Sequence, residues 1–345
     1  MFATRRSAIA AALAATIGVP GRGDAVGVRS GEYGAEGSAE AAEERQAKEG
    51  QAKGGQAKEQ LAKEGQTKEG QTIVKGVPVH YESRGSGRAV VMIHGFTLDR
   101  GSLIGCMEPV FAGRDGWRRI YFDLPGMGRT PGSESIASSD DLLDVVLGFI
   151  DAVIPGERFS LVGQSYGGYL ARGVLARRAA SIDGMALICP VVVAERGKRD
   201  LPPHTVVAKD AAFLASLSGG DADAFTSDFV VQNRVTWQRF QGELLPGIRR
   251  ADQAFLEGIA RHYALSFDPD ALAAPYPGPV LVLAGRQDSD VGYRDQWKMA
   301  ENFPRVTFAM LDRAGHGLLI EQPGLLTCAG REWLDRVVEA SGHSS

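Results

Sequence analysis

From Thr72 to about Ala340, short apolar runs alternate with stretches in which the apolar residues have the spacing of a helix. This alternation constrains the fold most, because strands joined by helical crossovers form a parallel sheet with helices on both faces. The predicted fold class is therefore α/β, with a mostly parallel central sheet and a site beyond the carboxyl ends of its strands. Strands are predicted at Val79–Glu82, Ala89–Ile93, Arg119–Asp123, Phe159–Gly163, Gly184–Cys189, Val280–Ala284 and Val306–Leu311. Helices are predicted at Ser139–Val153, Tyr166–Arg178 and Leu325–Glu339, the first with an N-cap at Ser139 and acids in its first turn.

The alternation stops between residues 191 and 268, where helix-like runs occupy 208–216, 222–232 and 251–265. An insertion of this kind between two strands is expected to form a helical cap over the site. Its aromatic side chains supply more apolar surface than a disordered segment has. They are Phe213, Phe225, Phe229, Trp237, Phe240 and Phe255. The predicted core then has two parts, residues 72–190 and 269–345.

Residues 1–71 are predicted to be a disordered N-terminal segment. From Gln46 to Gly70 a pentad related to Gln-Ala-Lys-Glu-Gly repeats, and a five-residue period fits neither a helix nor a strand. Arg5-Arg6 followed by an Ala-rich run has the outline of an export leader. An Ala-rich start of a cytoplasmic protein fits equally well, so the sequence predicts either location. The apolar run is too short to span a bilayer, so no integral membrane segment is predicted.

Composition excludes several classes of function. A net charge of −4 gives no basic field for nucleic acid, so the expected partner is a small-molecule substrate. The cysteines, Cys106, Cys189 and Cys328, are widely spaced and form no CxxC pair. The histidines form no HxxxH or HExxH pair, so neither a metal site nor another cofactor is predicted. The cysteines are expected to be partly buried thiols without a chemical role.

The strongest chemical signal is Gly163-Gln164-Ser165-Tyr166-Gly167. It follows an apolar strand and opens a helix, where a tight turn projects the serine hydroxyl out of the sheet. Glycines are needed on both sides because side chains there would clash in so sharp a turn. Ser165 is therefore the candidate nucleophile.

Further motifs accompany this serine. Residues 92–97 read Met-Ile-His-Gly-Phe-Thr, and residues 122–130 read Phe-Asp-Leu-Pro-Gly-Met-Gly-Arg-Thr. Residues 284–288 read Ala-Gly-Arg-Gln-Asp after a strand, and residues 314–317 read Ala-Gly-His-Gly after the last strand. In these motifs and their order, the chain from about Val79 to Glu339 resembles the α/β-hydrolase superfamily.

The resemblance implies a catalytic triad of Ser165, Asp288 and His316, with His316 as base and Asp288 as the acid that orients it. It also implies an oxyanion hole made by the backbone N–H groups of Phe96 and Tyr166. Asp290 is the competing choice for the acid.

His94 and Asp123 belong to motifs that shape loops in this superfamily, and both are expected to be structural. The strand that ends at Cys189 is followed by no carboxylate.

The leading hypothesis is hydrolysis of a small or medium ester-like substrate through an acyl-enzyme. A carbon–carbon bond hydrolase is an alternative, although many of these have an aromatic residue after the catalytic histidine, where this chain has Gly317. An aminopeptidase would need an acidic cap residue to hold the substrate amine. The candidates for it are Glu195, Asp210, Asp228 and Glu243. A non-catalytic small-molecule receptor is the alternative from a different class, while an aspartate-nucleophile enzyme is disfavoured by Ser165.

Overall fold

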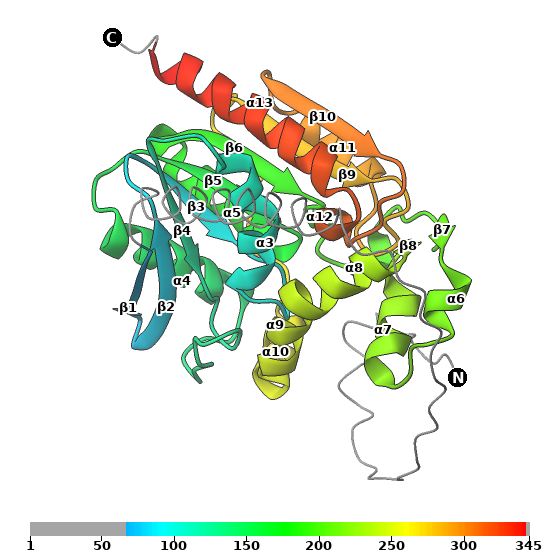
Figure 1. The fold of residues 1–345 in the computed structure, drawn as a ribbon. Coiled ribbons are helices and arrows are strands. Elements are labelled where there is room, and N and C mark those ends of the chain that lie inside the picture. The colour runs from blue at the N-terminus through cyan, green and yellow to red at the C-terminus, as the bar shows by residue number, and fades with distance from the viewer. Residues whose placement is uncertain (1–66, 343–345) are drawn as a thin grey trace, which may run out of the picture.

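The computed structural model describes residues 67–342, which form an eight-stranded sheet in the order β1-β2-β4-β3-β5-β6-β9-β10 (Figure 1). The strands from β4 to β10 are parallel, while β1 and β2 are antiparallel at one edge. The predicted mostly parallel sheet is therefore confirmed. The strands are β1 (Lys68–Val74), β2 (Val77–Arg84), β3 (Arg88–Ile93), β4 (Trp117–Phe122), β5 (Phe159–Gln164), β6 (Ile182–Ile188), β9 (Val280–Gly285) and β10 (Val306–Leu311).

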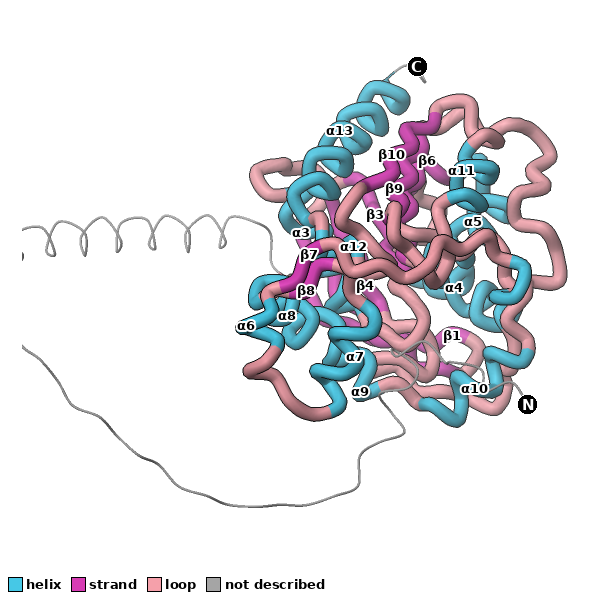
Figure 2. Tube along the Cα trace, turned by 90° about the vertical axis from the view of Figure 1, so that its right-hand side faces the viewer, coloured by secondary structure: helices cyan, strands magenta, loops and turns pink. Residues whose placement is uncertain are grey.

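Helices cover both faces of this sheet (Figure 2). One face carries α3 (Arg100–Phe111) and α13 (Pro323–Gly342), and the other carries α4 (Ser139–Val153), α5 (Tyr166–Arg178) and α11 (Arg294–Ala300). Because both faces are covered, every residue of β5 and of β9 is buried. Short elements at connections are η1 (Ala179–Ser181), η2 (Arg196–Lys198) and α12 (Leu318–Glu321).

The segment between β6 and β9 contains most of the remaining helices. They are α6 (Ala211–Leu214), α7 (Gly220–Asp228), α8 (Arg234–Arg239), the π-helix η3 (Phe240–Leu244), α9 (Leu245–Arg250) and α10 (Gln253–Arg261). The sequence indicated no strand here, yet β7 (Ala208–Lys209) and β8 (Val231–Gln232) form a short parallel pair. The run predicted as a helix over 222–232 therefore ends at Asp228. Stacked rings of Phe225 and Phe229, 5.1 Å apart, pack inside the segment.

The N-terminal segment begins to be ordered earlier than predicted. The sequence predicts disorder over residues 1–71, but Lys68–Gln71 lie in β1, paired with β2. Glu69 forms an ion pair of 2.9 Å with Arg129, and Gly70 lies against the ring of Tyr81, contacts that the repeat pattern does not reveal. The other repeats and the possible leader lie outside the described residues. Within residues 67–342, no helix is long and apolar enough to cross a membrane.

The start of α4 differs from the prediction by one residue. Ser138 is its N-cap, and its Oγ accepts a hydrogen bond of 3.2 Å from the N–H of Asp141. Ser139 instead lies 2.7 Å from the hydroxyl of Tyr166. The two adjacent serines have the same capping chemistry, so only the tertiary contact of Ser139 separates their roles.

Candidate active site

Ser165 occupies the turn between β5 and α5. Its φ of 54° and ψ of −117° lie outside the regions that L-residues ordinarily adopt. The turn is possible because glycine stands on both sides of it. A Cβ on Gly163 would lie 2.6 Å from the carbonyl oxygen of Gly167, and a Cβ on Gly167 would collide with the carbonyl oxygen of Ile93. The turn thus fixes the Ser165 hydroxyl at the carboxyl end of β5.

The structure brings Ser165, His316 and Asp288 together from three separate loops. Ser165 Oγ lies 2.8 Å from Nε2 of His316, and His316 Nδ1 lies 3.0 Å from Oδ2 of Asp288. These distances allow the imidazole to accept a proton from the serine while the carboxylate fixes its tautomer. The other oxygen of Asp288 accepts hydrogen bonds from the N–H groups of Asp290 and Val291, at 2.9 and 3.0 Å.

Asp290, the competing acid, points elsewhere. Its carboxylate accepts a hydrogen bond of 2.8 Å from Nη1 of Arg196. Its backbone N–H is what orients Asp288. The geometry therefore pairs His316 with Asp288, and Asp290 supports that pair through its main chain.

Opposite electrostatic effects act on the pKa values of this pair. Burial lowers the pKa of His316, but the adjacent Asp288 carboxylate outweighs burial and raises it to about 9. Burial raises the pKa of Asp288, while His316 and two backbone N–H groups outweigh burial and hold it below its ordinary value. The pair therefore favours a charged imidazolium, the species that forms when the serine loses its proton.

The two predicted oxyanion donors lie beside the nucleophile. Tyr166 is the first residue of α5, so its N–H is among the N-terminal amides that have no acceptor within the helix. Phe96 lines the same cavity as Ser165. The rings of Phe96 and Tyr166 pack edge to face, with their centroids 5.2 Å apart. This contact holds the two residues next to each other.

A cavity of about 200 Å³ opens onto Ser165 and His316. It is smaller than the roughly 300–1,000 Å³ of sites that hold drug-sized ligands. Phe229, Leu244 and Tyr263 line it from the segment between β6 and β9, and Leu98 and Leu319 line it from the core. The walls are mostly apolar, so the cavity accommodates a small, largely apolar group next to the serine.

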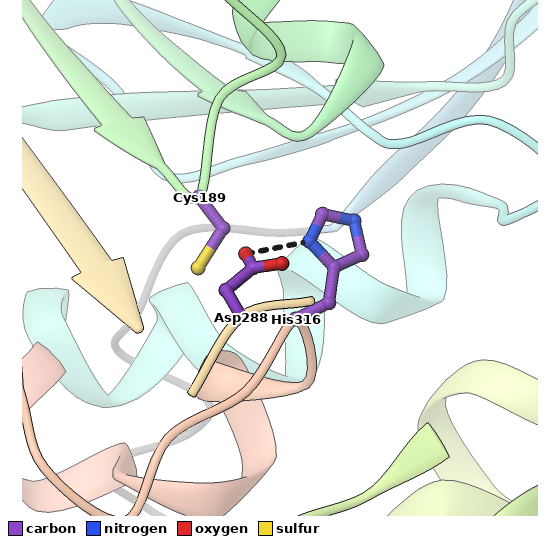
Figure 3. Close-up of side chains that lie close together, drawn as sticks. All are labelled: Cys189, Asp288 and His316. Atoms are coloured by element: carbon purple, nitrogen blue, oxygen red, sulfur yellow. Dashed lines mark hydrogen bonds and ion pairs between the residues drawn. The ribbon is translucent and has the colours of Figure 1, made fainter. Parts of the chain in front are cut away.

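Cys189 lies beside Asp288 (Figure 3). One ligand atom of each of Cys189, Asp288 and His316 lies within 4.8 Å of the others, close enough for one metal ion. However, His316 and Asp288 are already hydrogen-bonded to each other, and a metal there would have to break that bond. Burial, followed by the Asp288 charge, raises the pKa of the Cys189 thiol well above its ordinary value. The thiol is therefore kept protonated next to the carboxylate.

His94 and Asp123 hold loops, as expected. Nδ1 of His94 donates to the carbonyl oxygen of Gly95 at 2.8 Å, and Nε2 accepts from the N–H of Leu124 at 3.0 Å. Asp123 accepts hydrogen bonds from the N–H groups of Arg100 and Arg129, at 3.0 and 2.9 Å. Neither side chain is left to act on a substrate.

Glu321 is a site residue that the sequence reasoning missed. It is buried in α12, and its Oε2 accepts a hydrogen bond of 2.7 Å from the N–H of Gly315, next to His316. Its Oε1 accepts from the N–H groups of Val230 and Val231, at 2.7 and 3.0 Å. The sequence signal for it is a glutamate five residues after the candidate histidine. However, two of the three N–H groups that bind its carboxylate belong to Val230 and Val231, about 90 residues away.

A mostly parallel sheet with a serine on the turn after its fifth strand defines the class of hydrolases with this architecture. The model of the Alpha/beta hydrolase family matches residues 90–327, and the chain belongs to that family. The solved structure of an alpha/beta superfamily hydrolase from Oenococcus oeni PSU-1 has a TM-score of 0.71 at 28% identity, covering 78% of this chain and 99% of that one.

Two curated relatives are also hydrolases. The chain is 24% identical over 264 residues to the 2-hydroxy-6-oxo-6-(2'-aminophenyl)hexa-2,4-dienoic acid hydrolase of Metapseudomonas resinovorans, covering 76% of this chain and 89% of the relative. It is 25% identical over 257 residues to the pimeloyl-(acyl-carrier protein) methyl ester esterase of Nitrosomonas europaea, covering 71% and 95%. The names of these relatives share hydrolysis but give different substrates.

Proposed function

We propose that this protein is a serine hydrolase that cleaves a small or medium ester-like substrate through an acyl-enzyme. The observation that carries the proposal is the continuous contact from Ser165 Oγ to His316 at 2.8 Å and from His316 to Asp288 at 3.0 Å. Membership of a family whose relatives are named hydrolases supports the same reaction class.

The reaction follows from these contacts. His316 takes the proton of Ser165 as the oxygen attacks the substrate carbonyl carbon, and Asp288 stabilises the imidazolium that results. When the tetrahedral species collapses, His316 gives the proton to the leaving oxygen and the acyl group stays on Ser165. Water, activated by the same histidine, then attacks the acyl-enzyme and releases the acid.

The negative oxygen of the tetrahedral species needs donors in place beforehand. We assign this role to the backbone N–H groups of Phe96 and Tyr166. Loss of one such donor typically costs about 3 kcal/mol of transition-state stabilisation. The edge-to-face contact between the two rings would hold Phe96 and Tyr166, and with them the two N–H donors, in a fixed relative position.

Residues 191–268 are assigned the role of a cap, with core parts on either side of it. Phe229 and Tyr263 from this segment line the cavity, so substrate shape would be selected here. The core begins at Lys68 rather than at Thr72 because β1 belongs to the sheet.

Carbon–carbon bond hydrolysis is a second candidate on the same scaffold. The Metapseudomonas relative is named as the hydrolase of a dienoic acid, which supports this candidate. This chain has Gly317 after the histidine, but a Cβ there would lie 2.6 Å from Cδ1 of Phe229. An aromatic ring therefore contacts the position after His316 even though residue 317 is glycine.

Aminopeptidase activity depends on an acid that lines the cavity. Of the four acidic candidates in residues 191–268, Asp228 lines the cavity. Glu195 pairs with Lys198, Asp210 caps α6 and Glu243 pairs with Arg239. Asp228 is thus the residue that would hold a substrate amine.

Screening three substrate panels separates these reactions. Short-chain p-nitrophenyl esters, vinylogous diketones and amino-acid p-nitroanilides are offered to the full chain and to its Ser165→Ala variant. We expect turnover of the esters by the full chain and none above background by the variant. Equal ester turnover by both proteins would overturn the proposal, and cleavage of the diketones alone would favour the second candidate.

A further inference from the structure

Arg199 lies at the wall of the cavity, in the stretch that follows β6 and η2. Three carbonyl oxygens hold its guanidinium in one orientation. Nε donates to Val193 at 2.7 Å, Nη1 donates to Asp290 at 2.9 Å and Nη2 donates to Ala194 at 3.0 Å. The side chain is therefore a fixed cation whose plane is set before any ligand arrives.

The positive charge of Arg199 has no matching carboxylate. Within residues 67–342, no Asp or Glu oxygen lies within 4.0 Å of its nitrogen atoms. The neighbouring Arg196 differs, because it forms an ion pair of 2.8 Å with Asp290. An arginine has five N–H donors, and three of those on Arg199 bond to carbonyl groups. Both Nη atoms thus keep one N–H that is not used by the main chain, and these N–H groups are the donors that Arg199 can offer to a carboxylate and to the neighbouring Tyr263.

Tyr263 adds a neutral donor beside these N–H groups. Tyr263 lines the same cavity, and its phenol is close enough to Arg199 for the two side chains to interact. Burial raises the pKa of the Tyr263 phenol, and the nearby Arg199 charge lowers it by less. The phenol therefore stays protonated and available to donate to an anion.

The remaining charges that face the cavity do not cancel Arg199. Asp290 is neutralised by Arg196, and His316 forms its hydrogen bond with Asp288. Asp228 also lines the cavity and would repel an anion that approached it. The favourable place for an anion is consequently the wall formed by Arg199 and Tyr263.

We propose that Arg199, with the hydroxyl of Tyr263, forms a subsite for a carboxylate on the substrate, so that the preferred substrates are small esters that carry a second, anionic carboxylate group. This inference rests on the proposed function, because it assigns the substrate class of the same cavity. The cavity volume of about 200 Å³ restricts the chain between ester and carboxylate to a few atoms. A hydrogen bond to a charged group changes affinity by about 10- to 100-fold.

The test compares two ligands that differ in one charge. Monomethyl glutarate and dimethyl glutarate are titrated calorimetrically at pH 8 into the full chain carrying Ser165→Ala, which prevents turnover. We expect the monoester to bind at least tenfold more tightly than the diester. Adding Arg199→Gln should bring the ratio of the two affinities close to one, and Arg199→Lys should leave an intermediate ratio. The ratio of the two affinities is informative even if Arg199→Gln loosens the loop at Asp290, because a looser loop would weaken the binding of both ligands.

The matched control is Arg294→Gln, which removes an exposed arginine that pairs with Asp200. It changes net charge equally and should leave the preference unchanged. Equal binding of both ligands, binding of neither, or a preference that survives Arg199→Gln would overturn the subsite.

A separate assay keeps this result apart from the proposed function. Labelling of Ser165 by a fluorophosphonate probe is measured in the Arg199→Gln protein. Labelling without any anion preference contradicts the subsite alone. An anion preference without labelling of the protein that retains Ser165 and Arg199 contradicts the proposed function alone, and supports an anion-binding site.

Discussion

Oε2 of Glu321 accepts a hydrogen bond of 2.7 Å from the N–H of Gly315, the residue before His316. The other oxygen of this carboxylate, Oε1, accepts hydrogen bonds from the N–H groups of Val230 and Val231 in the segment between β6 and β9. One buried side chain therefore joins the histidine loop to the wall of the cavity. Losing it would leave three backbone N–H groups without their acceptor.

Glu321→Ala is expected to lower the free energy of unfolding by several kcal/mol. Each buried donor that loses its partner costs about 1–3 kcal/mol. Urea unfolding followed by fluorescence measures the change. Glu301→Ala, at the exposed glutamate that follows α11 as its C-cap, is the control and should change stability by less than about 0.5 kcal/mol. Similar effects of the two substitutions would contradict the role assigned to Glu321.

The stability contribution of Glu321 should depend on pH. Burial raises its pKa from 4.5 to about 7, against the lowering effect of the three N–H donors. Between those pH values the folded protein binds more protons than the unfolded chain, so stability falls as pH rises. Glu321→Gln cannot ionise, and the stability of the wild type relative to this variant should decline from pH 4.5 to pH 7. A constant difference across this range would show that the carboxyl group has an ordinary pKa.

The pH dependence of activity should follow His316. Its pKa is raised to about 9 by Asp288 although burial lowers it, and only the neutral imidazole accepts the serine proton. We expect kcat/KM for a neutral ester to rise with pH up to about 9. Asp288→Asn should move this limb toward 6.5 and lower kcat by on the order of 10⁴-fold. An unshifted limb in that variant would assign the titration to another group.

Substitutions of two glycines should act in opposite directions. A Cβ on Gly167 collides with the backbone of Ile93, so Gly167→Ala should destabilise the protein by at least about 1–3 kcal/mol and reduce activity. In α10, a Cβ on Gly258 meets only Arg261 Nη2, at 3.8 Å. Gly258→Ala should therefore stabilise the protein by up to about 1 kcal/mol, because alanine favours a helix. Urea midpoints compare the two variants, and a harmless Gly167→Ala would refute the tight turn.

The cysteines should react unequally with an aromatic disulfide reagent. Cys106 and Cys189 are buried, and burial raises the pKa of both thiols, whereas Cys328 is exposed. The folded protein should therefore release one equivalent of chromophore, and the protein in denaturant should release three. Fast release of two equivalents by the folded protein would mean that a buried thiol is accessible.

Local patterns predicted the sheet well, and they located the tight turn that carries the candidate nucleophile. The bounds predicted for α5 and β10 agree with the structure, because continuous apolar runs and the glycine turn are local signals. β1 was missed because its polar repeat residues become a strand only by pairing with β2. α3 was missed as well, since it contains Pro109 and two glycines that disfavour a helix.

The parts of the candidate site that the sequence did not predict depend on contacts between residues that are far apart in the sequence. Glu321 binds backbone groups of Val230 and Val231, and Arg199 binds the carbonyl group of Asp290. A backbone group is present at every residue whatever the side chain, so the sequence does not indicate which backbone groups Glu321 and Arg199 contact.

The mass of the intact protein after treatment with a fluorophosphonate probe tests the central claim most directly. We expect one covalent adduct, located on Ser165 by peptide analysis and absent from Ser165→Ala. Ser160→Ala, at a buried serine of β5 that lies five residues before the candidate nucleophile, serves as the control and should retain the adduct. An unmodified wild-type protein, or an adduct that persists in Ser165→Ala, would contradict the assignment of Ser165 as the nucleophile.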